Sequence, residues 1–298
     1  MKLPFAVRIF FKILSYIAPS LAARVAYPLF FRPLKFPIPE REKEFRSTAE
    51  SGKGELSSGR IHWFKKGGPG PKILFMHGWS GRGSQFTKMM DAFLEAGFEV
   101  YTLDAPGHGD EWLPRIDMLS FISGIHWMEK KFGPFDGAIG HSIGGMALWN
   151  AIREGAAIKW LVEIGSPSSL SGVLADFTAL LNARPAVAEI LKGKLSADYQ
   201  VAEDFFDPVR ITGLHPDVAG LLIHDAQDDE VPFNHALEME AAWKNGRLVT
   251  TEGLGHRKLL RDPGVIQLCL NFFANRSGEA RVKEARNILP RSLAFRLA

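Results

Sequence analysis

Gly140-His141-Ser142-Ile143-Gly144 is the stretch that decides the fold of this 298-residue chain. Residues 135–139, just before it, form a short apolar run, and residues 146–152, just after it, have the apolar spacing of a helix. The sequence therefore predicts a strand, a sharp turn and a helix, with Ser142 at the apex of the turn.

The two glycines of this stretch indicate what the turn is for. A serine hydroxyl is a poor nucleophile unless a base removes its proton and the side chain stands clear of its own backbone. A tight turn exposes Ser142, and Gly140 and Gly144 carry no Cβ that would clash with the strand or the helix. The turn also directs the backbone N–H of Ile143, at the start of the predicted helix, toward the place where an oxyanion would form. The stretch therefore indicates nucleophilic catalysis by Ser142.

A nucleophilic serine needs a base, and the base needs a carboxylate that orients it. His256 follows the last predicted strand, in a loop that begins at Gly253 and is rich in glycine. Asp228 follows the apolar run 221–223, and strand ends are where open α/β sheets gather their functional groups. The chain order of the predicted set is Ser142, Asp228, His256.

Short apolar runs alternate with helix-period segments between residues 59 and 253, which predicts an α/β fold with a mostly parallel sheet covered on both faces. Ser84 is expected to cap a helix over 85–96, which Gly97 would end. Glu163 is a carboxylate inside a predicted buried strand, where we expect a structural hydrogen bond or ion pair. The predicted strands are 61–64, 73–76, 98–103, 135–139, 160–164, 221–223 and 248–250.

The alternation stops at about 168–215, where no strand is predicted. This interval predicts a helical lid inserted into the sheet, with helical pieces at 170–183, 186–191 and 202–206. Its large apolar side chains either roof an apolar pocket or pack the lid onto the body; they are Phe177, Leu180, Leu181, Phe205 and Phe206.

Four motifs resemble those of an α/β-hydrolase-fold protein of the serine hydrolase type, and the resemblance covers roughly residues 59–275. They are His77-Gly78-Trp79, Asp104-Ala105-Pro106-Gly107-His108-Gly109, residues 225–232 and residues 255–260. The resemblance implies a catalytic triad of Ser142, Asp228 and His256, with the backbone N–H groups of Trp79 and Ile143 as the oxyanion hole. Nearby carboxylates compete for the role of the acid, and only similarity to the family's acid-bearing loop favours Asp228 over Asp225, Asp229 and Glu230.

The resemblance implies a hydrolase that cleaves a carboxylic ester or thioester through an acyl-enzyme, with a small-molecule acyl substrate and no cofactor. Amidase, carbon–carbon hydrolase and acyltransferase chemistry share this machinery, and the same fold also serves as a ligand-binding protein without catalysis. A serine in the turn argues against dehalogenases and epoxide hydrolases of this fold, which need a carboxylate there. No metal-binding motif occurs in the sequence, and a net charge of +3 does not suggest nucleic-acid binding.

The two ends of the chain differ from the predicted hydrolase domain at 51–275. Residues 1–50 predict an amphipathic helical extension whose apolar run, Phe5 to Ala18, is too short and too charged for a membrane span. Three interpretations of this run stay open: a packed helix, a helix lying in a membrane interface, or a signal peptide. Residues 276–298 predict a basic helical tail. We expect a cytoplasmic protein, with peripheral membrane contact through the first helix as the open alternative.

Overall fold

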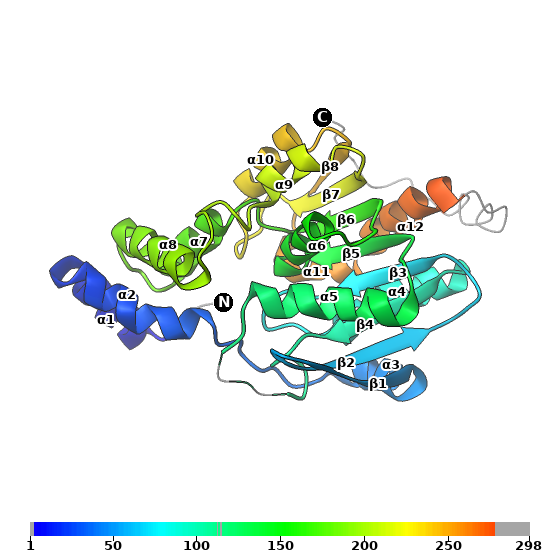
Figure 1. The fold of residues 1–298 in the computed structure, drawn as a ribbon, viewed down its shortest axis with the longest axis horizontal. Coiled ribbons are helices and arrows are strands. Elements are labelled where there is room, and N and C mark those ends of the chain that lie inside the picture. Colours follow the sequence, from blue (N-terminus) through cyan, green and yellow to red (C-terminus); the bar gives the residue numbers. More distant parts are fainter. Residues whose placement is uncertain (1–2, 112, 114, 278–298) are drawn as a thin grey trace.

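Eight strands form one sheet in the computed structural model, which describes residues 3–111, 113 and 115–277 (Figure 1). The strand order is β1-β2-β4-β3-β5-β6-β7-β8. β2 is antiparallel to both of its neighbours, whereas the pairs from β4 to β8 are all parallel, which confirms the predicted mostly parallel sheet. The strands are β1 (Glu50–Leu56), β2 (Gly59–Lys66), β3 (Lys72–Met76), β4 (Glu99–Asp104), β5 (Gly137–His141), β6 (Trp160–Ile164), β7 (Ala219–Asp225) and β8 (Gly246–Thr251).

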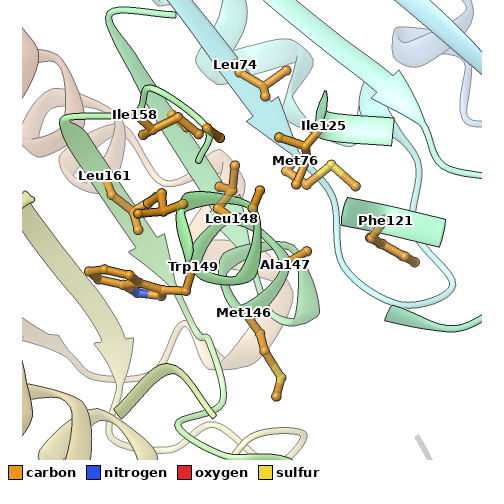
Figure 2. Packing of buried hydrophobic residues seen from close by; sticks show 14 of the residues in the cluster. Leu74, Met76, Phe121, Ile125, Met146, Ala147, Leu148, Trp149, Ile158 and Leu161 are labelled. Atoms are coloured by element: carbon orange, nitrogen blue, oxygen red, sulfur yellow. The ribbon is translucent and has the colours of Figure 1, made fainter. Parts of the chain in front are cut away.

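Helices cover both faces of this sheet, as a doubly covered parallel sheet requires. One face packs against a cluster that includes Phe121, Trp149 and Met239, and the other against a cluster that includes Phe93 and Phe273. Figure 2 shows part of the first cluster, where Trp149 lies beside Leu161 of the sheet. The helices of the first face are α5 (Met118–Phe132), α6 (Ile143–Arg153) and α10 (Asn234–Ala242), and those of the second are α3 (Glu40–Thr48), α4 (Thr87–Glu95) and α12 (Pro263–Ser277).

A third core lies beyond the carboxyl ends of the parallel strands and belongs to four helices (Figure 1). There the hairpin of α1 and α2 packs on α7 and α8, two helices that lie between β6 and β7 in the chain. The rings of Phe30 and Phe177 meet edge to face at 5.2 Å, and Ser15 Oγ accepts a hydrogen bond from the backbone N–H of Arg184. The bounds are α1 (Phe5–Ile17), α2 (Pro19–Phe30), α7 (Leu170–Leu180) and α8 (Pro185–Tyr199).

The strand β1 was not among the strands predicted from the sequence. Its sequence, Glu-Ser-Gly-Lys-Gly-Glu-Leu, is polar and has two glycines, so it shows no alternation of apolar and polar residues. β1 lies at the edge of the sheet and pairs with β2 alone, through backbone hydrogen bonds that leave little trace in side-chain patterning. Strand β5 also begins and ends two residues later than the predicted 135–139, because Gly140 and His141 continue the strand rather than the turn.

The expected helical piece at 202–206 is wrong, because the chain forms turns there and the helix begins at Pro208 instead. This helix is α9 (Pro208–Leu214), and proline suits the first turn of a helix, where its missing N–H costs nothing. The expected cap of the helix at 85–96 is also wrong: Ser84 Oγ donates to Glu42, and the chain forms a short 3-10 turn, Gly83–Phe86, before α4. Gly97 follows the end of α4 with a φ of 87°, as expected.

The predicted basic tail at 276–298 lies outside the described residues except for its first two positions, which end α12. In the part of the chain that the structure describes, no helix is both long and apolar enough to cross a bilayer.

Candidate active site

Ser142 lies between the end of β5 and the start of α6, with a φ of 54° that is rare for any residue other than glycine. Both flanking glycines are needed for close packing. A Cβ on Gly140 would lie 2.5 Å from Gly145 Cα of the following helix, and one on Gly144 would lie 2.3 Å from the carbonyl oxygen of Met76 in β3. The turn is therefore a strained strand-to-helix elbow of the kind that the sequence predicts.

Asp228 and His256 are joined by a hydrogen bond of 2.7 Å between Oδ2 and Nδ1. The other oxygen of Asp228 accepts the backbone N–H groups of Glu230 and Val231, at 2.8 and 2.9 Å. Burial alone would raise the pKa of Asp228, but the hydrogen bonds from His256 and from the backbone lower it below its ordinary value. Asp228 therefore stays ionised and can hold the imidazole of His256 in one tautomer.

The carboxylates that compete with Asp228 have other partners. Asp225 Oδ2 accepts from the hydroxyl of Thr251 and from the backbone N–H of Leu254, which fixes the loop that carries the histidine. Glu230 makes a bidentate ion pair with Arg257 at 2.8 and 3.1 Å. Asp229 is exposed and lines the same cavity as Ser142 without a hydrogen bond to His256. Of the four carboxylates, only Asp228 contacts the imidazole of His256.

Ser142 and His256 line one cavity, but no hydrogen bond joins their side chains among the described residues. Both are largely buried, with exposed fractions of 9% and 6%. Catalytic hydrogen bonds are often long or poorly aligned without substrate and tighten only when it binds. The structure thus brings the serine, the histidine and the aspartate to one place, with the contact between Asp228 and His256 formed and the contact between His256 and Ser142 open.

The expected oxyanion donors, the backbone N–H groups of Trp79 and Ile143, make no hydrogen bond within the described part of the chain. Ile143 is the first residue of α6, where the N–H groups have no partner within the helix. The loop that carries Trp79 is held by His77, whose Nδ1 bonds Gly78 O at 2.7 Å and whose Nε2 accepts Ala105 N–H at 3.0 Å. One free donor therefore lies on the loop after β3 and the other at the start of α6, directly after Ser142.

Two more histidines support the site through contacts that the sequence did not predict. His108 Nε2 accepts the backbone N–H of Ser80, the residue after Trp79, and His141 Nε2 bonds the carbonyl oxygen of His256 at 3.0 Å. Burial lowers the pKa of both rings to about 3, so they stay neutral near pH 7 and act as fixed hydrogen-bonding groups. The motif turns that contain them were visible in the sequence, but their partners belong to distant segments.

The cavity above Ser142 has a volume of about 1070 Å³ and a mainly apolar lining. This exceeds the roughly 300–1,000 Å³ of most ligand pockets. Its walls come from the loops around Ser142, from α7 and α8, and from the N-terminal hairpin, whose part in the site the sequence did not predict. The apolar residues expected over the pocket that line the cavity are Phe177, Leu180, Leu181 and Phe206. Phe205 packs against Arg153 instead.

A second serine–histidine–carboxylate cluster lies nearby. Ser168 Oγ is 2.7 Å from His235 Nδ1, and His235 Nε2 is 3.3 Å from Asp176. Ser168 is fully buried, its hydroxyl also bonds Glu238, and its own backbone N–H donates to His235 Nδ1. A substrate cannot reach this hydroxyl, so the cluster ties α7 to the body of the protein. No group of His, Cys, Asp or Glu side chains suited to hold a metal ion occurs among the described residues.

Glu163 lies in β6 behind the elbow and makes no ion pair or well-formed hydrogen bond in the described chain, contrary to expectation. A Cβ on Gly145 would lie 2.8 Å from its Oε1 and 2.1 Å from Ser166 Oγ, so the carboxyl group packs directly against α6. Burial raises the pKa of Glu163 to about 8, although Trp149 and Ser166 beside it favour the charged form. Glu163 is therefore a neutral acid at pH 7.

We expect Glu163→Gln to gain stability relative to the natural protein as the pH rises from about 4.5 to about 8. Below that range Glu163 is protonated in the folded and the unfolded chain alike. Within it the unfolded chain loses the proton that the folded chain keeps, which favours unfolding of the natural protein by a few kcal/mol at the upper end. Thermal unfolding across this pH range measures the difference in stability between Glu163→Gln and the natural protein. Glu44→Gln, at an exposed position, is the control. A stability difference between the two proteins that does not change with pH would contradict the burial of Glu163 as a neutral carboxyl group.

Comparison with known proteins places the chain among proteins of the same architecture. A model of the alpha/beta hydrolase family matches residues 73–266. The bifunctional epoxide hydrolase 2 of Sus scrofa is 25% identical over 155 residues, which are 48% of this chain and 25% of that protein. The chain thus spans about a quarter of the length of this curated relative.

Solved structures share the fold at low sequence identity. An esterase of Pyrococcus furiosus superposes with a TM-score of 0.62 at 14% identity, covering 83% of this chain and 100% of that one. A putative lipase from Acinetobacter baumannii AYE has a TM-score of 0.60 at 16% identity and covers 81% of this chain and 98% of its own. A bromoperoxidase from Bacillus anthracis gives 0.57 at 19% identity, over 76% and 100%.

Proposed function

The chain belongs to the alpha/beta hydrolase family, and from that membership we propose that it is a serine hydrolase of carboxylic esters or thioesters. One observation carries the proposal: Ser142, on a strained elbow, shares a cavity with His256, which is hydrogen-bonded to the ionised Asp228. Lipases and esterases among the structural relatives are consistent with this chemistry.

The proposed reaction has two halves. His256 Nε2 takes the proton of Ser142 Oγ while the oxygen attacks the acyl carbonyl, and the N–H groups of Trp79 and Ile143 bind the oxyanion of the tetrahedral intermediate. The ester or thioester bond of the intermediate then breaks, and His256 gives its proton to the departing alkoxide or thiolate. The acyl group stays bound to Ser142 as an acyl-enzyme. A water molecule, deprotonated by His256, releases the acid and regenerates the serine. Asp228 stabilises the imidazolium in both halves.

A panel of p-nitrophenyl esters from acetyl to palmitoyl tests this function. The size and apolar lining of the cavity support a preference for long acyl chains, so kcat/KM is expected to rise from acetyl to the medium and long chains. Absence of turnover with every ester and thioester tried, in a folded protein, would argue for amide or carbon–carbon chemistry or for a binding protein on the same fold.

Val173→Trp is expected to reverse this preference. Val173 lies on α7 and lines the cavity, so an indole there would occupy the space of a long acyl chain. The variant should lose about tenfold or more in kcat/KM for the long esters, with little change for the acetyl ester. Ala175→Trp, on the exposed side of the same helix, is the control. Equal losses for short and long esters would show that Val173 does not border the acyl site.

A further inference from the structure

The N-terminal hairpin exposes an unusual amount of apolar side chain. Ile17 is 78% exposed, Phe5 also 78% and Tyr16 64%, although this hairpin buries its other face against α7 and α8. The exposed apolar residues continue through the segment that follows α2, and the hairpin patch is defined by Phe5, Phe10, Ile13, Tyr16, Ile17, Leu21, Val25, Leu29, Leu34 and Phe36. A patch of this extent marks a surface that binds something apolar.

The charge of the same segment shows what kind of partner suits it. Residues 1–39 contain no Asp or Glu. Their basic residues are Lys2, Arg8, Lys12, Arg24, Arg32 and Lys35. Of these, Lys12, Arg24, Arg32 and Lys35 are exposed among the residues of the hairpin patch. A segment that exposes both apolar and basic side chains and no acidic ones matches an anionic lipid surface, into which the apolar groups insert while the charges meet the headgroups.

The patch also borders the mouth of the active-site cavity. Leu29, Leu34 and Phe36 are each about 40% exposed, and all three line the cavity that contains Ser142. The segment after α2 is bonded to the oxyanion loop as well: Leu34 N–H donates to Ser80 Oγ, and Arg82 donates to the carbonyl oxygen of Phe36. If an apolar surface covers the patch, a molecule from that surface would therefore pass directly into the cavity without crossing water.

We propose that the hairpin patch docks on an anionic lipid bilayer and that the acyl ester cleaved at Ser142 is an amphiphile drawn from that bilayer. The docking half of the proposal depends only on the exposed apolar side chains and the basic charge of this segment. The half that concerns the substrate rests on the proposed function. The apolar residues insert below the headgroups, Lys12 and Arg24 contact anionic phosphate groups, and the mouth at Leu29, Leu34 and Phe36 faces the bilayer.

Co-sedimentation of the full chain with vesicles tests the docking. Binding is expected to vesicles that contain phosphatidylglycerol, with much weaker binding to pure phosphatidylcholine and a decrease with added salt. Ile13→Glu/Ile17→Glu should abolish binding, and Lys12→Gln/Arg24→Gln should weaken it about tenfold or more. The matched controls alter exposed residues away from the hairpin and should bind normally: Leu214→Glu/Leu237→Glu and Lys88→Gln/Arg247→Gln.

Three results would overturn the docking. The first is the absence of binding to anionic vesicles by the folded protein. The second is equal loss of binding in the hairpin variants and in the matched controls. A concentration-dependent dimer that Ile13→Glu/Ile17→Glu dissolves, without vesicle binding, would assign the patch to a second copy of the chain and would also overturn it.

The substrate half is tested with two esters, one dissolved in water and one embedded in a bilayer. Ile13→Glu/Ile17→Glu should hydrolyse a water-soluble p-nitrophenyl ester at the natural rate but lose most of its activity on a long-chain ester embedded in anionic vesicles. Equal activity of this variant and the natural protein on the embedded ester would refute delivery from the bilayer. A protein that binds vesicles but hydrolyses neither ester would refute the proposed function and leave the docking supported.

Discussion

Ser142→Ala is expected to lower kcat for an ester substrate by about six orders of magnitude, because the variant lacks the oxygen that attacks the acyl carbonyl in the proposed reaction. In the proposed mechanism the remaining histidine, aspartate and oxyanion donors act as a unit with the serine and cannot replace it. Initial rates with the best ester of the panel, measured with equal amounts of folded protein, give the ratio directly. A thermal unfolding curve verifies that the variant folds, as expected for loss of one oxygen at the cavity wall.

Ser168→Ala is the matched control for this experiment. Ser168 also lies within hydrogen-bond distance of a histidine, but it is buried and does not face the cavity. Its replacement should leave ester turnover near the natural rate. If Ser168→Ala loses activity and Ser142→Ala keeps it, the nucleophile has been assigned to the wrong cluster.

Asp228→Asn should lower kcat by about four orders of magnitude while leaving the geometry of the site almost unchanged. An amide in this position favours the wrong tautomer of His256, with the proton on Nε2, so the imidazole can no longer accept the proton of Ser142. It also removes the negative charge that stabilises the imidazolium. Values of kcat for the best ester of the panel, measured with equal amounts of the folded variant and the folded natural protein, give the ratio.

Asp229→Asn is the control, since Asp229 lines the cavity one residue away and makes no hydrogen bond to His256. Activity close to that of the natural protein is expected. A large loss in Asp229→Asn with a small loss in Asp228→Asn would reverse the choice of acid that the hydrogen bonds favour.

Motifs with fixed local geometry could be predicted from the sequence. Gly140 and Gly144 allow a turn that side chains would block. The need for glycine at these two positions is therefore visible in the sequence itself. The apolar runs of β3, β6 and β7 likewise identify buried parallel strands, because both faces of such strands are covered. The fold class follows from these local patterns.

Features that depend on distant partners could not be predicted. The edge strand β1 is fixed by its pairing with β2 and not by its own apolar pattern. His141 bonds the backbone of His256, which is 115 residues away in the chain, and no spacing rule connects them. The part of the N-terminal hairpin in the cavity wall was missed for the same reason, since its apolar spacing fits a packed helix and a membrane-surface helix equally well.

Mass spectrometry of the protein after reaction with a fluorophosphonate tests most directly whether Ser142 is an activated nucleophile in this cavity. We predict one phosphonyl group per chain, located on the peptide that contains Ser142, with no labelling of Ser142→Ala and full labelling of Ser168→Ala. An unlabelled natural protein, or a label on any other serine that persists in Ser142→Ala, would contradict the assignment of Ser142 as the nucleophile.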